Sequence, residues 1–455
     1  MSTATTSAAT RILEQFKWEP QPEAERWVAE LVNHCLSCLP EAGQFADRLQ
    51  REAGVRFVDL VSHIGVNRQD VDRHGFKNAG WSEVGVGVYA NQSGIFPNVY
   101  VGDHVDCKIG TKVESVVDFL AANNLYRDIL QYPLANHRSA VITESNDAEW
   151  SVIEHHGGPQ PGIFETDPSA DKVLRIFEQV RTRMRFNRSD DDGFMHASVV
   201  IDQGIESVGV DRACDLFFAA EREYWQRRNR AAQVQKARQD RLGIGWANHD
   251  HHTYRSSRRH FSRLIAIWEK LGFVCRERFY AGKEAGWGAQ VMEQPNAGIV
   301  TFNDVDLSPD ELLIDFAHEP LPERKELGTV GLWCALHGES FLEAGMHHLE
   351  CMFDFNALKE QLERDHNVGV MKPFTDFPYL KQAFTVGERW PVREERIAAL
   401  LSKGQITAEQ AEKFRAEGAI GSHLENLERN QGFKGFNQTG VSEIIAATDP
   451  RKHLR

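Results

Sequence analysis

The sequence predicts an α+β protein in which tandem βαβββ modules form a cup-shaped mixed sheet, with an N-terminal helical region and additional helices. Three observations lead to this fold class. The chain has 455 residues, more than a typical single core holds. Short β-branched runs bounded by Gly, Asn and Pro alternate with segments of helical periodicity. The C-terminal half repeats one pattern, a histidine-bearing strand that runs into a helix, as a modular fold would.

The composition is that of an ordinary globular protein and argues against several classes of function. Hydrophobic residues make up 41% of the chain and charged residues 26%. A net charge of −14 makes nucleic acid an unexpected partner, because its binding depends on Lys and Arg neutralising phosphates. The sequence has no apolar run long enough to span a membrane, and residues 1–10 lack the basic and apolar parts of a signal peptide. We therefore expect a cytoplasmic protein without a membrane partner.

The order of the patterns divides the chain into five parts. These are an N-terminal helical segment (1–54), an N-terminal α+β domain that is a candidate degenerate βαβββ module (55–209), a long connecting helix (210–245), a metal-binding paired βαβββ domain (246–396), and a C-terminal helix and tail (397–455). In the second part we predict a strand around residues 196–201. In the last part, Thr407 and Gln410 have the spacing of a capping box at the start of a helix.

The paired domain is predicted element by element. Its first unit has a strand over 249–255, a helix over 258–271 that ends at Gly272, and strands over 274–280, 288–293 and 298–303. Its second unit has a strand over 329–336 that leads to a histidine-bearing segment at 345–350, a helix over 356–365, and strands over 368–371 and 381–386. When two such units pair, their opening strands can point side chains at a shared centre.

Strand parity selects the candidate ligand in the first unit, because alternate residues of a strand share a face. His249, His251 and Arg255 lie on one side, and Asp250 and His252 on the other. We choose His251 as the ligand, since Arg255 then lies further along the same face, where it could bind the carboxylate of an acid held by the metal.

For the second unit we choose His348 over His347, since His348 begins the alternation His348, Glu350, Met352. Two imidazoles with one carboxylate leave coordination positions free for substrate and oxygen on iron(II). The carboxylate is open at this point: Glu394 is the first choice, and its competitors are Glu388, Glu350 and Glu339.

At these residues the chain resembles the vicinal oxygen chelate superfamily, and within it the 2-oxoadipate dioxygenase/decarboxylase family of iron(II) enzymes. His251 and Arg255 are similar to that family's ligand His followed four residues later by a carboxylate-binding Arg, and residues 347–349 resemble its Asn-His-Leu motif. Residues 389–396 match its third motif loosely, which implies Glu394 as the ligand glutamate. The resemblance covers less than half of the chain.

The expected function is therefore a metal-dependent dioxygenase that acts on a small 2-oxo acid or related carboxylate, with Fe(II) as the metal, O2 as co-substrate and loss of CO2. Arg255 would clamp the substrate carboxylate, and Tyr254 or a spare histidine would handle protons. A vicinal oxygen chelate isomerase or lyase that uses Zn, Ni or Mn is the first alternative, and a non-enzymatic small-molecule binding protein is the second. The oligomeric state stays open, with a homodimer as one option.

Overall fold

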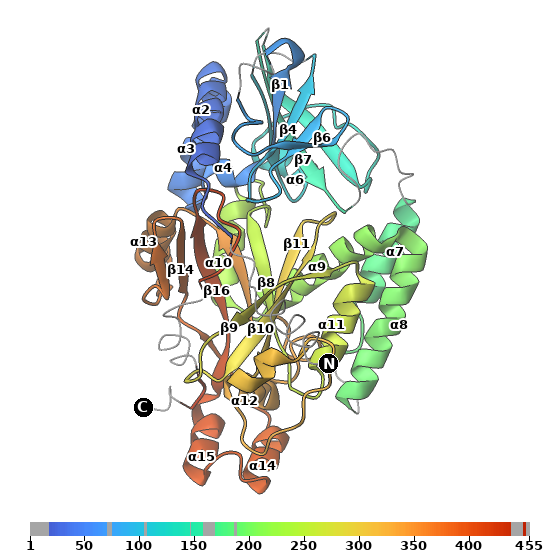
Figure 1. Ribbon diagram of the computed structural model, residues 1–455, viewed down its shortest axis with the longest axis vertical. Coiled ribbons are helices and arrows are strands. Elements are labelled where there is room, and N and C mark those ends of the chain that lie inside the picture. The colour runs from blue at the N-terminus through green and yellow to red at the C-terminus, as the bar shows by residue number, and fades with distance from the viewer. Residues whose placement is uncertain are drawn as a thin grey trace, which may run out of the picture.

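The computed structural model describes residues 18–70, 75–103, 107–145, 147–157, 169–185, 189–437 and 449–451. Their strands form two mixed sheets, one of seven strands in the N-terminal half and one of nine in the C-terminal half. Figure 1 shows the N-terminal sheet at the top of the view and the C-terminal sheet below it in the middle, with helices packed around them. This arrangement of mixed sheets and helices confirms the predicted α+β fold class.

The C-terminal sheet consists of two βαβββ units with the same strand order. The first contains β8 (His249–Arg255), α11 (Phe261–Lys270), β9 (Val274–Tyr280), β10 (Trp287–Gln294) and β11 (Ile299–Asp306). The second contains β12 (His348–Met352), α13 (Phe355–His366), β13 (Thr375–Phe377), β14 (Leu380–Phe384) and β16 (Ala419–Arg429), with β15 (Glu388–Trp390) also paired to β16. In each unit the last strand lies parallel beside the first. Antiparallel pairing of β8 with β12 joins the units into one sheet.

Two predicted features of the C-terminal half are corrected by these elements. Residues 329–336 form the helix α12 (Thr329–His337) and not a strand. Nearly every residue of α12 is buried, so its sequence lacks the polar face that distinguishes a helix from a buried strand. The carboxylate of Asp306 accepts hydrogen bonds from the backbone N–H groups of Gly328, Val330 and Gly331 and so caps this helix.

The second correction concerns residues 397–455, expected to be a helix and tail. They also contain β16, which lies inside the C-terminal sheet between β12 and β14. Before β16 come α14 (Glu394–Ser402) and α15 (Ala408–Glu417). The capping box of α15 is confirmed, because Thr407 and Gln410 exchange both hydrogen bonds.

The N-terminal sheet has the same strand order as the main path of the C-terminal one, but with one strand fewer in its second half. Its elements are β1 (Val61–Asn67), β2 (Ser82–Gly85), β3 (Val88–Ala90), β4 (Asn98–Gly102), β5 (Cys107–Lys112), α6 (Val116–Ala122), β6 (His137–Glu144) and β7 (Ala148–His155). β1 pairs parallel with β4, β5 pairs parallel with β7, and β1 pairs antiparallel with β5. Before this sheet come α2 (Pro22–Cys38), α3 (Pro40–Ala53) and α4 (Phe57–Leu60).

The helices that link the two sheets differ from the prediction in two places. They are α7 (Ala170–Arg181), α8 (Asp190–Val208), α9 (Val210–Gln226) and α10 (Arg230–Asp240). The strand expected at residues 196–201 is part of α8, which begins at the N-cap Ser189 with three aspartates in its first turn, a favourable position for negative charge. The long helix expected over 210–245 is interrupted at Asn229, whose side chain accepts a hydrogen bond from the Ala232 N–H and starts α10.

The main hydrophobic core runs through both halves of the chain, and part of it lies between these helices and the C-terminal sheet. Phe217 and Phe218 of α9 pack against Trp268 of α11, with ring centroids 5.7 and 5.2 Å away. This packing holds the face of β8 that carries Tyr254 against helices, so the other face of β8 is left to line a site. Among the described helices, none has the length and apolar character needed to cross a membrane.

Candidate metal centre

One histidine and two glutamate side chains form a row across the middle of the C-terminal sheet. The strand register places His251 of β8 opposite Glu350 of β12, and Glu350 beside Glu425 of β16. Ligand atoms of these three residues all lie within 4.8 Å of one another, and all three residues are buried. His348 lies two residues before Glu350 on the same face of β12.

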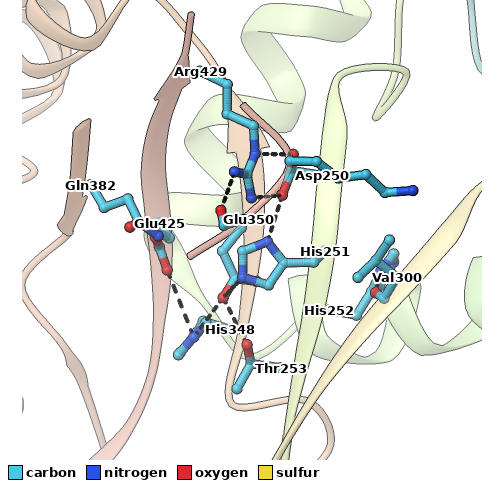
Figure 2. Close-up of polar contacts among 12 residues, drawn as sticks. Asp250, His251, His252, Thr253, Val300, His348, Glu350, Gln382, Glu425 and Arg429 are labelled. Carbon is cyan, nitrogen blue, oxygen red and sulfur yellow. Dashed lines mark hydrogen bonds and ion pairs between the residues drawn. The ribbon is translucent and has the colours of Figure 1, made fainter. Parts of the chain in front are cut away.

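The carboxylate of Glu350 is the centre of this group (Figure 2). Its Oε1 lies 3.0 Å from Nε2 of His251 and 2.7 Å from Nε2 of His348. The Thr253 hydroxyl donates to the same oxygen at 2.7 Å. Glu425 lies alongside, with its Oε2 3.8 Å from Nε2 of His348. Two imidazole nitrogens from different strands thus point at one position.

The orientation of His251 is set by a chain of hydrogen bonds behind it. Nδ1 of His251 lies 2.7 Å from the Asp250 carboxylate, which also accepts from Nε and Nη2 of Arg429 at 2.8 and 3.0 Å. Because Asp250 is ionised, with its pKa lowered by Arg429 and His251 against the effect of burial, it accepts the Nδ1 proton. Nε2 then carries the lone pair that faces the centre, as in carboxylate-supported metal ligands.

The protonation states of the group also suit a metal. Burial lowers the pKa of His251 and lowers that of His348 well below its usual value, so both imidazoles are neutral at pH 7. Burial raises the pKa of Glu425 to about 8, and burial together with the charge of Glu425 raises the pKa of Glu350 well above its usual value. Two carboxylates this close cannot both be ionised without a compensating cation.

A divalent metal would supply that compensation. Glu350 Oε2 and His348 Nδ1 are buried and have no hydrogen-bond partner in the described residues, so the group is incompletely satisfied without a cation. Two neutral imidazoles with carboxylates form a donor set that suits Fe(II), Zn, Ni or Mn. The residues present therefore fit a metal, which His251 and His348 would hold with Glu425, Glu350 or both.

A small pocket opens on the group and has mostly aromatic walls. Its volume is about 50 Å³, and its lining is His251, Thr253, Arg255, Phe279, Trp287, Phe302, Asp304, His348, Glu350, Phe374, Thr375, Gln382, Phe384, Glu425, Phe436 and Asn437. From β11, Phe302 and Asp304 line the pocket, and the Phe302 ring lies 5.9 Å from the His251 ring between their centroids.

Arg255 contributes the positive charge of the pocket. Its Nε lies 3.6 Å from Oδ2 of Asp304, and its guanidinium lies over the Trp333 ring at 5.6 Å. Burial raises the pKa of Asp304 to about 7 although Arg255 lowers it, so at neutral pH this aspartate compensates the arginine only in part. Arg255 thus has both charge and donors available for an anionic ligand.

The structure brings together some predicted site residues and separates others. His251, His348 and Arg255 all line the pocket, on the faces that strand parity assigned to them. Tyr254 points to the opposite face of β8, where its hydroxyl lies 3.4 Å from Glu221. It cannot handle protons in this pocket, because neighbouring strand residues alternate between faces.

Glu394 does not join the histidines. It begins α14 with 58% of its side chain exposed, and it forms an ion pair with Arg415. Of its competitors, Glu388 accepts from the Arg230 N–H, and Glu339 is bound by Ser256, Ser257 and His260. Only Glu350 among the four candidates lies in the group.

Sequence reasoning missed Glu425 altogether. The signal that could have found it is the repeat itself, because a second βαβββ unit requires a fourth strand after residues 381–386. The next β-compatible run after them is Ala419–Arg429, in which Leu424 and Leu427 are buried. Had that strand been placed in the sheet, its glutamates Glu425 and Glu428 would have joined the ligand candidates.

Comparisons with known proteins give distant structural similarities only. No protein-family model matches the chain, and no curated protein matches it. A glyoxalase superfamily protein from Ralstonia eutropha JMP134 is 11% identical, with 59% of this chain and 99% of that chain covered and a TM-score of 0.34. Methylmalonyl-CoA epimerase from Mycobacterium tuberculosis is 11% identical, with 40% of this chain and 88% of that chain covered and a TM-score of 0.23. A 4-hydroxymandelate synthase variant from Streptomyces coelicolor is 11% identical, with 86% of this chain and 98% of that chain covered and a TM-score of 0.26.

At such low identity and TM-score these similarities carry no argument about this chain. The fold assignment rests on the chain's own strand order, in which two βαβββ units pair through their first strands to form an α+β fold.

Proposed function

We propose that this chain is a metal-dependent enzyme of the vicinal oxygen chelate type that acts on a small carboxylate. The observation that carries the proposal is the convergence of the His251 and His348 Nε2 atoms on the carboxylate of Glu350, with Glu425 beside it, at the base of a pocket. A buried group of this kind is costly to maintain without a cation, and it lies where a substrate could reach it.

The specific activity we propose is an Fe(II) dioxygenase reaction on a 2-oxo acid. In it, R–CH2–CO–COOH and O2 give R–CH(OH)–COOH and CO2, so both oxygen atoms of O2 enter the products. Bound iron(II) would supply polarisation of the oxo acid and activation of O2. A pocket of about 50 Å³ holds only a few water-sized groups, which supports a short acid.

The chain's own residues have three tasks in this proposal. Arg255 binds the substrate carboxylate, because its charge is only partly compensated by Asp304. The aromatic side chains Phe279, Phe302 and Phe384 exclude water from the reacting atoms. Asp250 holds the Nδ1 proton of His251 and so keeps Nε2 available to the metal.

The test is metal analysis followed by an oxygen assay. Protein purified without oxygen should contain one equivalent of a divalent metal, and with Fe(II) it should consume O2 and release an equal amount of CO2 when given short 2-oxo acids. The double variant His251→Ala, His348→Ala should contain no metal. Protein that retains no metal under any condition, with ligand binding unchanged in the double variant, would instead be a non-enzymatic binding protein.

A second candidate is an isomerase or lyase that uses Zn, Ni or Mn. The observation that favours it is the presence of two glutamates, Glu350 and Glu425, within reach of the same histidines. Four protein ligands would leave fewer open positions than an oxygenase needs. Metal-loaded protein that consumes no O2 with any 2-oxo acid, yet binds carboxylates in an Arg255-dependent way, would support this second candidate.

A further inference from the structure

A second and much larger cavity lies between the N-terminal sheet and the C-terminal half. Its volume is about 1130 Å³, slightly above the roughly 300 to 1,000 Å³ of typical small-molecule pockets, whereas the pocket at the metal centre measures about 50 Å³. Tyr100, Lys112 and Ile153 line it from the N-terminal sheet, and Met352 and Arg429 line it from the C-terminal half. None of the metal-ligand groups found among the described residues lies in its lining.

Among the residues that the structure describes, one cation in the cavity lining, Lys112, has no ion pair. Of the other charged side chains in its lining, Arg56 binds Asp59 at 2.7 and 2.8 Å, Arg429 binds Asp250 as described above, and Glu25 accepts from the Gln431 N–H. Lys112 has no carboxylate within 4 Å in the part of the chain that the structure describes, and Asp59 and Asp250 attract it from a greater distance. Burial lowers the pKa of Lys112, so its charge is poorly solvated.

Part of the cavity lining presents apolar side chains to solvent. Val58, Val84, Val86 and Ile95 all line it, and they are 38%, 44%, 102% and 39% exposed. Exposed apolar residues that gather in one concavity mark a binding site more often than scattered ones do. A half-buried cation and an apolar wall in the same cavity are complementary to a molecule with a carboxylate and a hydrocarbon chain.

We propose that this cavity binds a small amphipathic monocarboxylate, with the carboxylate on Lys112 and the hydrocarbon chain against Val84, Val86 and Ile95. Such a ligand gives Lys112 the counter-ion that it lacks and covers the exposed apolar wall. The proposal does not depend on the metal centre, whose carboxylate-binding residue is Arg255 in the other sheet.

The test uses octanoate as the probe on the full chain, measured by isothermal titration calorimetry. Octanoate should bind, and octan-1-ol should bind at least about tenfold more weakly because it lacks the charge. Lys112→Met should weaken octanoate binding by a similar factor. The matched control is Lys108→Met, on the same face of β5 but paired with Glu149 at 2.9 Å and outside the cavity lining; it should leave octanoate affinity within about twofold.

Three results would overturn the proposal. One is the absence of octanoate binding at millimolar concentration, and another is equal binding of octanoate and octan-1-ol. The third is octanoate binding that persists in Lys112→Met but is lost in Arg255→Met, since the carboxylate would then occupy the metal pocket. If Lys112→Met fails to fold by circular dichroism, Lys112→Gln and the comparison of octanoate with octan-1-ol in the unchanged protein decide the question.

Discussion

Replacing Glu425 with glutamine should stabilise the metal-free protein and abolish metal binding. Burial raises the pKa of this carboxyl from 4.5 to about 8. At pH 7 the unfolded chain has therefore released the proton, whereas the folded protein retains it, and folding is penalised. Because pH 7 lies about 2.5 pH units above 4.5 and each unit corresponds to about 1.4 kcal/mol, the penalty is about 3 kcal/mol.

Glutamine removes this penalty, because it carries no charge in either state. Its amide can still meet the side chain of Gln382, which donates to Glu425 at 2.9 Å. The free energy of unfolding of the metal-free Glu425→Gln protein at pH 7 should therefore rise by up to about 3 kcal/mol, an increase that should vanish near pH 4. The measurement is urea denaturation of chelator-treated protein at the two pH values.

The same variant should lose the stabilisation that metal confers. Metal at a hundredfold excess over its dissociation constant stabilises a folded protein by about 2.7 kcal/mol, and Glu425→Gln should show little or none of this increase. Glu394→Gln is the control, since its exposed side chain pairs only with Arg415 in the described structure and should affect neither measurement. A Glu425→Gln protein that binds metal as tightly as the unchanged chain would refute the assignment of Glu425 to the centre.

Three further predictions follow from the same environment. Arg255→Met should weaken binding of a short 2-oxo acid at least about tenfold while metal content, measured by mass spectrometry, stays the same. The pKa of Asp304 is about 7 in the folded protein, compared with 3.8 ordinarily, so the folded state holds this proton more tightly than the unfolded chain does. The free energy of unfolding of metal-free protein should therefore fall as the pH rises from about 4 to 7. Asp304→Asn should reduce that fall, measured by urea titration. Thr407→Ala should lower the free energy of unfolding by about 1 kcal/mol in the same assay, through loss of the capping box of α15.

The histidines of the site could be predicted because strand parity is a local property. His251 and Arg255 belong to one seven-residue strand, so their shared face follows from counting along the chain. The same count places Tyr254 on the opposite face, and assigning it a catalytic role overlooked this consequence. The choice of His348 over His347 used the same reasoning within β12.

The carboxylates could not be predicted in this way, because their positions depend on strand register. Glu350 faces His251, and Glu425 faces Glu350, only through pairings between strands that are far apart in the chain. A motif match pointed to Glu394, which is near the end of the predicted paired domain but lies on an exposed helix. Helix α12 was misassigned for a related reason, since a segment buried on all sides has no polar face to reveal its period.

The paired strands at the middle of the two sheets carry different side chains. In the C-terminal sheet, β8, β12 and β16 bring His251, Glu350 and Glu425 into one row. In the N-terminal sheet, the corresponding strands β1, β5 and β7 have a row of His63, Gly110 and Ser151.

That N-terminal row contains a single imidazole and no carboxylate, so it cannot form a comparable donor set. The strands that pair at the middle of each sheet thus carry different side chains, and these set the chemistry that each sheet offers. In the N-terminal sheet they include Lys112 of β5, the cation to which we assign a carboxylate ligand.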